Sequence, residues 1–162
     1  MAAAANPHVE LARALIQAHA DVNAKTNIAR TPLMFAAESN PNVEVIQALV
    51  QAGADVNAAD DFSSDPSNSA PTAPAAERCQ VITDHVCVSL GGATVLMHAA
   101  LLNPSLEILR ALIQAGAHVN TTATNNTLGS SYANRQTTAL YLANKYNGNP
   151  AIGEELRKFG GH

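Results

Sequence analysis

The sequence predicts an all-α solenoid made of stacked helix-turn-helix repeats, and two recurring phrases carry this prediction. The phrase "ALVQAGADVN" at 48–57 returns almost unchanged as "ALIQAHADVN" at 14–23 and as "ALIQAGAHVN" at 111–120. A second phrase, which begins with threonine, reads "TPLMFAA", "TVLMHAA" and "TALYLAN". A short helical unit cannot bury its apolar face alone, so recurrence of this kind indicates that the units stack on one another.

Each repeat is expected to open with a short helix. The hydroxyl of Thr31 is suited to cap the first free amides, and Pro32 fits the first helical turn. The letters "MFAA" follow, and their alanines permit close packing between neighbouring repeats. Thr94 and Thr138 open the equivalent segments.

A second helix is expected to follow, opened by Asn-Pro at 40–41 in the same way. Residues 43–50 carry apolar side chains at helical spacing, which predicts one buried stripe. Gly53 suits the left-handed residue that ends a helix, and the polar letters after it favour a turn. One unit is therefore a helix, a turn, a second helix and an extended loop.

The intervals between repeats locate two insertions. The glycine position of the recurring phrase falls at 19, 53 and 116, which gives intervals of 34 and 63 residues. Asn-Pro dipeptides start at 6, 40, 103 and 149, with intervals of 34, 63 and 46. With 34 as the unit, the excesses are 29 and 12 residues. All 29 lie between Asn57 and Thr94, ten lie between Asn120 and Thr138, and the last two are expected around "KYNG".

The phrase "TPLMFAAESNPNVEVIQALVQAGADVNA" resembles an ankyrin repeat, with "TPL..AA" opening the first helix and "GADVNA" forming the finger loop. The resemblance extends over 2–57, 91–120 and 137–162. It implies a single domain of about four repeats, at approximately 1–23, 24–57, 91–120 and 137–162. The insertions are then approximately 58–90 and 121–136.

Two departures from the family pattern affect the expected structure. The family's "TPLH" histidine is replaced by Met34, Met97 and Tyr141, so the polar link that this histidine makes between repeats is not expected in its usual form. His19 stands where the other repeats carry glycine, which predicts a strained or adjusted helix end.

The two ends of the chain look different. The alignment places Met1 inside a first helix, and residues 2–5 offer no polar outer face, which favours a piece of a longer array or a cap located elsewhere. The last helix is expected to act as a polar cap. Its charged residues are Glu154, Glu155, Arg157 and Lys158.

The larger insertion has two parts. "DDFSSDPSNSAPTAP" is typical of an irregular loop, whereas "RCQVITDHVCVSL" is β-branched and predicts a small β-hairpin around Thr83 and Asp84. Cys79 and Cys87 would lie close enough for a bond across the strands if the register matches, but two reduced thiols are the favoured alternative. The smaller insertion is polar, with Tyr132 as its one aromatic anchor.

Composition argues against several classes of partner. The net charge of −4 and the pI of 5.8 argue against binding to a phosphate backbone, which needs clustered lysine and arginine. No apolar run approaches the roughly 18 residues of a membrane span, and the first residues do not resemble a signal peptide. A cytoplasmic protein is expected, with a secreted effector as the alternative.

Candidates for chemistry are weak. His118 and His162 occupy the same finger position and form a conceivable metal pair, but no cysteine or carboxylate shares a zinc-site spacing, so exposed turn positions are favoured. His85 beside the two cysteines suggests a thiol and its base, yet no orienting partner is evident. His98 lies in the first helix of its repeat, where a partly buried, hydrogen-bonded role is favoured over catalysis. Gly91-Gly92 lacks the lysine and spacing of a phosphate loop. We therefore predict no catalytic residue, no cofactor and no bound metal.

The sequence favours a non-catalytic scaffold that binds another protein through its finger loops, its concave face and the insertions, because insertions in repeat arrays often mark the binding face. Phe62 and Tyr132 are the expected aromatic anchors. One alternative is a regulatory or targeting segment of a larger enzyme or effector, joined to further repeats or domains. A second is a small-ligand or metal site formed by the insertions. The candidate contact residues, among which Glu38 and His98 are expected as surface positions of the first helices, are Glu38, Asp55, Asn57, Phe62, His98, His118, Asn120 and Tyr132.

Overall fold

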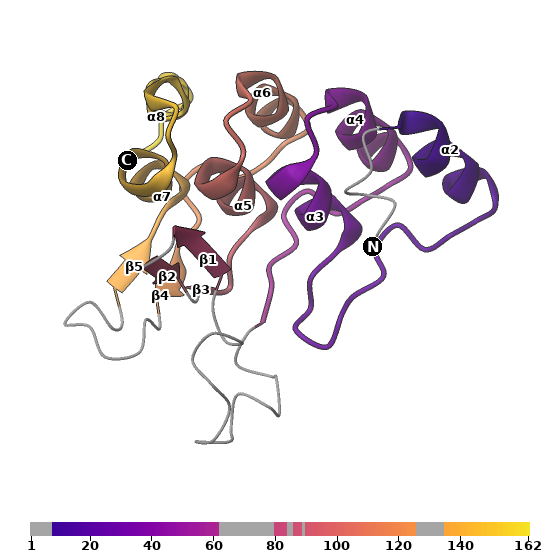
Figure 1. Cartoon of the computed structure of the whole chain (residues 1–162), viewed down its shortest axis with the longest axis horizontal. Helices are drawn as coiled ribbons and strands as arrows, with labels where there is room; N and C mark the ends of the chain where they lie inside the picture. Colours follow the sequence, from indigo (N-terminus) through magenta and orange to yellow (C-terminus); the bar gives the residue numbers. More distant parts are fainter. Residues whose placement is uncertain (1–7, 62–79, 84–85, 89, 126–134) are drawn as a thin grey trace.

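The computed structural model describes residues 8–61, 80–83, 86–88, 90–125 and 135–162; the side chains of 80–90 and 124–136 are not described. The helices form two rows that run side by side along the array (Figure 1). The first-helix row contains α3 (Pro32–Ser39), α5 (Val95–Leu102) and α7 (Ala139–Tyr146). The second-helix row contains α2 (Val9–Gln17), α4 (Val43–Gln51), α6 (Leu106–Gln114) and α8 (Pro150–Lys158). The predicted solenoid of stacked helix-turn-helix units is confirmed.

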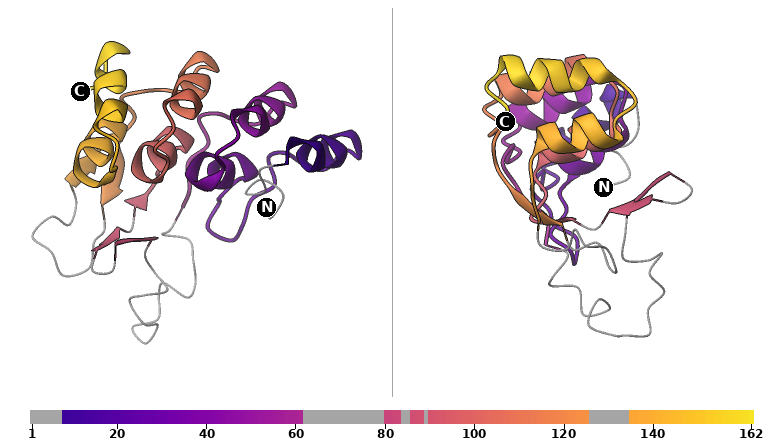
Figure 2. Two further views of the ribbon diagram at one scale, coloured as in Figure 1. Left: turned by 45° about the horizontal axis from the view of Figure 1, so that its top comes forward. Right: turned by 90° about the vertical axis from the view of Figure 1, so that its left-hand side faces the viewer.

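The strands lie beyond the first-helix row, on the side away from the second helices (Figures 1 and 2). The predicted hairpin is present: β1 (Gln80–Thr83) pairs antiparallel with β2 (Val86–Val88), with Val81 opposite Cys87. Its turn residues and Cys79 lie outside the described residues, so the question of a Cys79–Cys87 bond stays open.

A three-stranded sheet connects the two insertions, and the sequence did not predict it. Strand β3 (Leu90–Gly91) pairs with β4 (Ala123–Asn125), and β4 pairs with β5 (Arg135–Thr137). The strands come from two different fingers, so pairing between distant segments stabilises them and the polar local sequence gives little signal. The end of the larger insertion thus lies beside the start of the smaller one.

The three threonines cap the first helices as predicted. The side-chain oxygens of Thr31 and Thr94 each accept from a methionine amide at 3.4 Å, and that of Thr138 accepts from the amide of Tyr141 at 3.3 Å. Pro32 occupies the first turn of α3. Each of these first helices therefore begins at the threonine that the sequence predicts.

The predicted start of the second helix is wrong by two residues. Helix α4 begins at Val43, and its N-cap is Asn42, whose side chain accepts from the amide of Glu44 at 2.9 Å. Asn40 instead ends α3, and its side chain accepts from the amide of Asn42 at 2.8 Å. The Asn-Pro dipeptide therefore shapes the turn between the helices.

The two extra residues expected around "KYNG" are absent. Helix α7 starts 44 residues after α5, and α8 starts 44 residues after α6. Asn147, not Asn149, is the equivalent of Asn103: Asn103 Nδ2 donates to the carbonyls of Ala37 and Asn40, and Asn147 Nδ2 donates to those of Ala100 and Asn103. The Asn-Pro dipeptide at 149–150 is out of register, so only ten residues are added in this repeat, all in the finger.

Small side chains allow the first helices to pack closely. Ala36, Ala37 and Ala100 are fully buried and Ala99 is 2% exposed. Met34 and Met97, which replace the histidine of the resembled pattern, are buried as well. Packing at this position is therefore apolar in these two repeats.

His19 adopts the left-handed conformation that its position demands. Its φ is +59°, where Gly53, Gly116 and Gly160 have φ between +81° and +94°. A side chain at positive φ is strained. The predicted strain at this helix end is confirmed.

Helix α8 was predicted to carry four charged residues on a polar cap, and one of the four is buried. Glu154, Arg157 and Lys158 are exposed, but Glu155 is buried at 6% exposure and faces α6. Its carboxylate accepts from Arg110 Nε at 2.7 Å and from Lys158 Nζ at 3.1 Å. Glu155 therefore links the last two second helices.

Candidate functional site

Asparagine side chains join each finger to the next. Asn57 Nδ2 donates to the Gly116 carbonyl at 3.1 Å, and Asn57 Oδ1 accepts from the His118 amide at 2.9 Å. The same pair of bonds recurs one repeat earlier and one later. Asn23 Nδ2 donates to the Gly53 carbonyl, and Asn23 Oδ1 accepts from the Asp55 amide. Asn120 makes the same two bonds with the Gly160 carbonyl and the His162 amide.

We call each of these pairs of hydrogen bonds an asparagine clamp. At one equivalent position of every finger the side chain is exposed. The four exposed residues, which we call the finger edge, are Asp21, Asp55, His118 and His162. Each aspartate also accepts from the asparagine amide two residues later, at 2.9 Å, which fixes its own turn. The finger edge is thus a row of polar side chains on a backbone held in register.

The first-helix row contains a buried cluster of charged side chains. His98 on α5 is 2% exposed; its Nδ1 lies 2.7 Å from Glu38 Oε1 and its Nε2 lies 3.1 Å from Asp60 Oδ2. The Nδ1 contact is an ion pair without good hydrogen-bond alignment. Arg30 forms an ion pair with the same oxygen of Glu38, and its guanidinium lies 4.3 Å from the centre of the Phe35 ring. Two cations and two anions are thus gathered in one buried cluster.

The cluster changes the ionisation of its members. Burial disfavours the charged form of His98, but Asp60 and Glu38 outweigh this effect and raise the pKa of His98 above its ordinary value. Burial also opposes ionisation of Glu38, but His98 and Arg30 outweigh it and lower the pKa of Glu38. The cluster therefore favours the ionised forms of both groups.

Comparison with known families identifies the repeats. A family model described as ankyrin repeats (3 copies) matches residues 1–60, and a model for the ankyrin repeat matches residues 91–126. The two matches together cover more than half of the chain. The chain belongs to the ankyrin repeat family. No curated protein matches it.

The last ankyrin unit, α7 and α8, lies beyond both matched segments. It keeps the threonine cap, the asparagine clamp and the helix spacing of the unit before it. Ankyrin repeats are generally protein–protein interaction modules and are typically non-catalytic.

The structure separates the candidate contact residues into three groups. Asp55, His118 and Asn120 are exposed on the fingers, and Asn57 is half-buried with its amide engaged in a clamp. Phe62 and Tyr132 lie outside the described residues. The third group, Glu38 and His98, is part of the charged cluster.

The expectation that His98 is a surface position of its ankyrin repeat is wrong, because its ring is buried between two carboxylates. The other expectation for His98, a buried and hydrogen-bonded role, agrees with its contact with Asp60. Glu38 is nearly covered, with 10% of its side chain exposed. Sequence reasoning missed Arg30 and Asp60, the other members of the cluster. Asp60 is 38 residues from His98, and no local pattern connects them.

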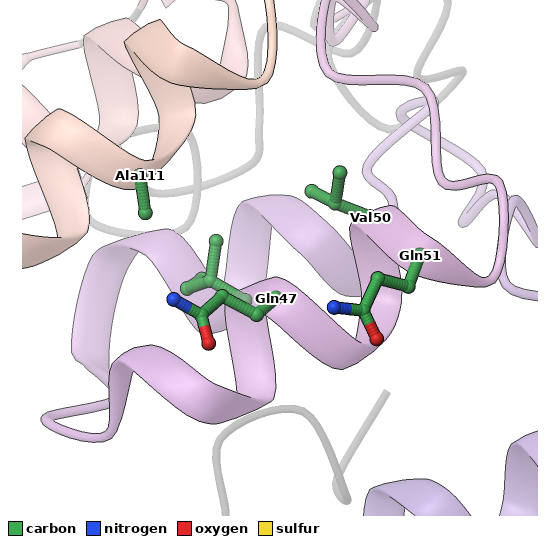
Figure 3. A pocket seen from close by; sticks show the side chains of 5 residues that line it. Gln47, Val50, Gln51 and Ala111 are labelled. Atoms are coloured by element: carbon green, nitrogen blue, oxygen red, sulfur yellow. The ribbon is translucent and has the colours of Figure 1, made fainter.

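Two surface hollows in the described part of this ankyrin array lie between neighbouring helices of the same row. Figure 3 shows the groove between α4 and α6, where Gln47, Val50 and Gln51 of α4 face Ala111 of α6. Its volume of about 100 Å³ is below the roughly 300 Å³ at which ligand pockets begin. A wider, open hollow of about 380 Å³ lies between the ends of α3 and α5 and is lined by Ser39, Leu102 and their neighbours.

The described residues contain neither a metal-binding cluster nor a membrane-spanning helix. No three histidine, cysteine, aspartate or glutamate side chains in this part of the chain are arranged to hold a metal ion. None of the helices described is long and apolar enough to cross a membrane.

Proposed function

We propose that this chain is a non-catalytic scaffold that binds a partner protein through the finger edge. The observation that carries the proposal is the set of three asparagine clamps, which fix neighbouring fingers while Asp55 and His118 stay exposed. Association costs less when the contacting backbone is already ordered, because less conformational freedom is lost on binding. A clamped row of polar side chains suits protein recognition better than catalysis.

We propose that the insertions extend this surface. Strand β3 ends the larger insertion and β4 begins the smaller one, and Gly91 pairs with Thr124 between them. Phe62 and Tyr132 belong to these two segments in the sequence, and aromatic side chains contribute strongly at interfaces. We therefore keep both as proposed anchors beside the finger edge.

A pull-down from the native host with paired variants tests the proposal. The double variant Asp55→Asn, His118→Asn removes the titratable groups of the two central fingers, and the amide oxygen introduced by Asp55→Asn can still accept the hydrogen bond of the turn. The control, Gln47→Ala with Glu107→Ala, alters exposed residues of the second-helix row. We expect the finger-edge variant to lose a partner that the wild type and the control retain.

Equal recovery of every partner by the wild type, the finger-edge variant and the control would show that the fingers are not the binding surface. A partner lost only by the control would place the interface on the second-helix row. Circular dichroism of all three proteins verifies that the array is folded.

A further inference from the structure

The two ends of the larger insertion meet at a junction of backbone hydrogen bonds. The amide of Asp60 donates to the Ala93 carbonyl at 3.0 Å, and the amide of Gly92 donates to the Asp60 carbonyl at 3.2 Å. Ala59 and Thr94 form an isolated antiparallel bridge beside them. We call residues 59–61 and 91–94 the insertion root.

The carboxylate of Asp60 is built into this root. Asp60 Oδ1 accepts from the Ala93 amide at 2.7 Å, and Asp60 Oδ2 lies 3.1 Å from His98 Nε2. The Asp60 side chain is fully buried. His98 therefore contacts the group that holds the two ends of the insertion together.

The position of the His98 ring favours its doubly protonated form. One ring nitrogen faces Glu38 and the other faces Asp60, at 2.7 and 3.1 Å. A neutral imidazole carries one N–H and would place a lone pair against one of the two carboxylates. The imidazolium can donate from Nε2 to Asp60 and still bring positive charge against Glu38, whose contact with Nδ1 is an ion pair. Since the ring is 2% exposed, water has little room to take the place of the missing donor.

Helix packing alone does not require a histidine at this place. The equivalent position, four residues after the capping threonine, is Phe35 in α3 and Leu142 in α7. Both neighbours pack an apolar side chain against the core. A histidine at this position therefore matches the presence of the insertion root, and the insertion root occurs in this repeat.

We propose that His98 is a positioning residue that holds the insertion root closed as an imidazolium, so that closure of the root depends on pH. In a closed cluster Arg30 and His98 balance Glu38 and Asp60. When His98 loses its proton, Arg30 is the one remaining cation against two buried carboxylates, and an uncompensated buried charge is costly. The biological consequence, control of how the insertions are presented, rests on the proposed function.

The other charged groups around α5 do not act on the ring. The root also contributes Asp61, α6 contributes Glu107 and Arg110, and α7 contributes Tyr141, Lys145 and Tyr146. Besides burial, the groups that shift the ionisation of His98 are Asp60 and Glu38. Titration of the ring therefore reports on this cluster.

The pKa directions define when the root is closed. The pKa of His98 is raised, so its stabilising contribution is complete below the ordinary histidine value and is lost as pH rises through the raised value. The pKa of Glu38 is lowered, so its contribution is complete above the ordinary glutamate value and is lost as pH falls through the lowered value. Closure is expected around neutral pH, with opening on both sides.

Nuclear magnetic resonance of the whole chain tests the proposal without a partner. Ring ¹⁵N shifts of His98 are followed from about pH 6 to about pH 10, together with hydrogen exchange of the Ala93 amide corrected for its intrinsic pH dependence. The His98→Gln variant, which cannot titrate, assigns the ring signals and serves as the comparison. We expect both His98 nitrogens to be protonated at neutral pH and Ala93 exchange to rise about tenfold as the ring titrates, in the wild type only.

Two outcomes overturn the proposal: a neutral His98 tautomer at neutral pH, or the same exchange step in His98→Gln. Glu38→Gln gives a second check, because loss of one carboxylate should move the His98 midpoint about one pH unit lower. An unchanged midpoint would contradict the cluster. Since no partner is present, failure here leaves the finger-edge proposal intact, and loss of partner binding by the finger-edge variant says nothing about His98.

Discussion

The side chain of Asn57 holds the backbone of His118 in place, although the two residues are 61 positions apart in sequence. Its carbonyl oxygen accepts from the His118 amide at 2.9 Å while its amide group donates to Gly116. One side chain thus joins two fingers that the larger insertion separates in sequence. Register along the finger edge therefore depends on a few asparagines.

Removing the clamp should destabilise the array. We expect Asn57→Ala to lower the free energy of unfolding by about 1–2 kcal/mol, because two hydrogen bonds are lost. Asn57→Asp keeps the acceptor for His118 and loses the donor to Gly116, so its effect should be smaller. Urea denaturation measures both, with Gln47→Ala as a surface control. A loss no larger than that of the control would contradict the structural role of the clamp.

The threonine caps give a second prediction. Thr94→Ala should cost about 1 kcal/mol of stability, because the amide of Met97 loses its side-chain acceptor at the buried start of α5. Thr94→Ser keeps the hydroxyl and is the matched control. Thermal unfolding of the three proteins distinguishes them, and equal losses in both variants would mean that the methyl group, not the cap, is responsible.

Relief of backbone strain should stabilise the first unit. His19→Gly is expected to raise the free energy of unfolding by about 0.5–1 kcal/mol, since glycine tolerates the φ of +59° and part of the gain is offset by its greater freedom when unfolded. The reciprocal change Gly53→His, at φ +89°, should destabilise. The denaturant midpoints of the two variants, compared with that of the wild type, measure both effects. A drop in stability for His19→Gly would argue against strain.

The buried carboxylate of α8 should make stability sensitive to acid. The pKa of Glu155 is lowered to about 2 by hydrogen bonds from Arg110 and Lys158. Its contribution is therefore complete above the ordinary pKa of 4.5 and is lost as pH falls from there toward 2. We expect Glu155→Gln to be less stable than wild type at neutral pH, with the difference shrinking in acid.

The matched control for that experiment is Glu154→Gln, which alters an exposed position of the same helix. Unfolding curves at several pH values compare the three proteins. A gap between wild type and Glu155→Gln that stayed constant down to about pH 2 would contradict the assigned ion pairs.

The sequence predicted those parts of the fold that depend on local pattern. The repeated threonine, the apolar spacing and the β-branched runs "QVIT" and "VCV" located the first helices, the solenoid and the hairpin, because caps and periodicity are local signals. The Asn-Pro dipeptide misled at 149–150 because the same two letters occur there two residues out of register.

Prediction of the candidate site was limited for another reason. Finger residues such as Asp55 were correctly expected at turns. His98 was expected both as a partly buried, hydrogen-bonded residue and as a surface contact, and it is buried. Its contacts with Glu38 and Asp60 exist only after repeats stack, and Asp60 is fixed by Ala93 across the insertion. Interactions between residues that distant leave no periodic trace in one sequence.

The central claim is that the clamped finger edge binds a partner protein. Isothermal titration calorimetry of a recovered partner with wild type, Asp55→Asn/His118→Asn and Gln47→Ala/Glu107→Ala tests it most directly. We expect affinity at least about tenfold weaker for the finger-edge variant, equivalent to about 1.4 kcal/mol, and unchanged affinity for the second-helix control. Equal dissociation constants for all three proteins would contradict it.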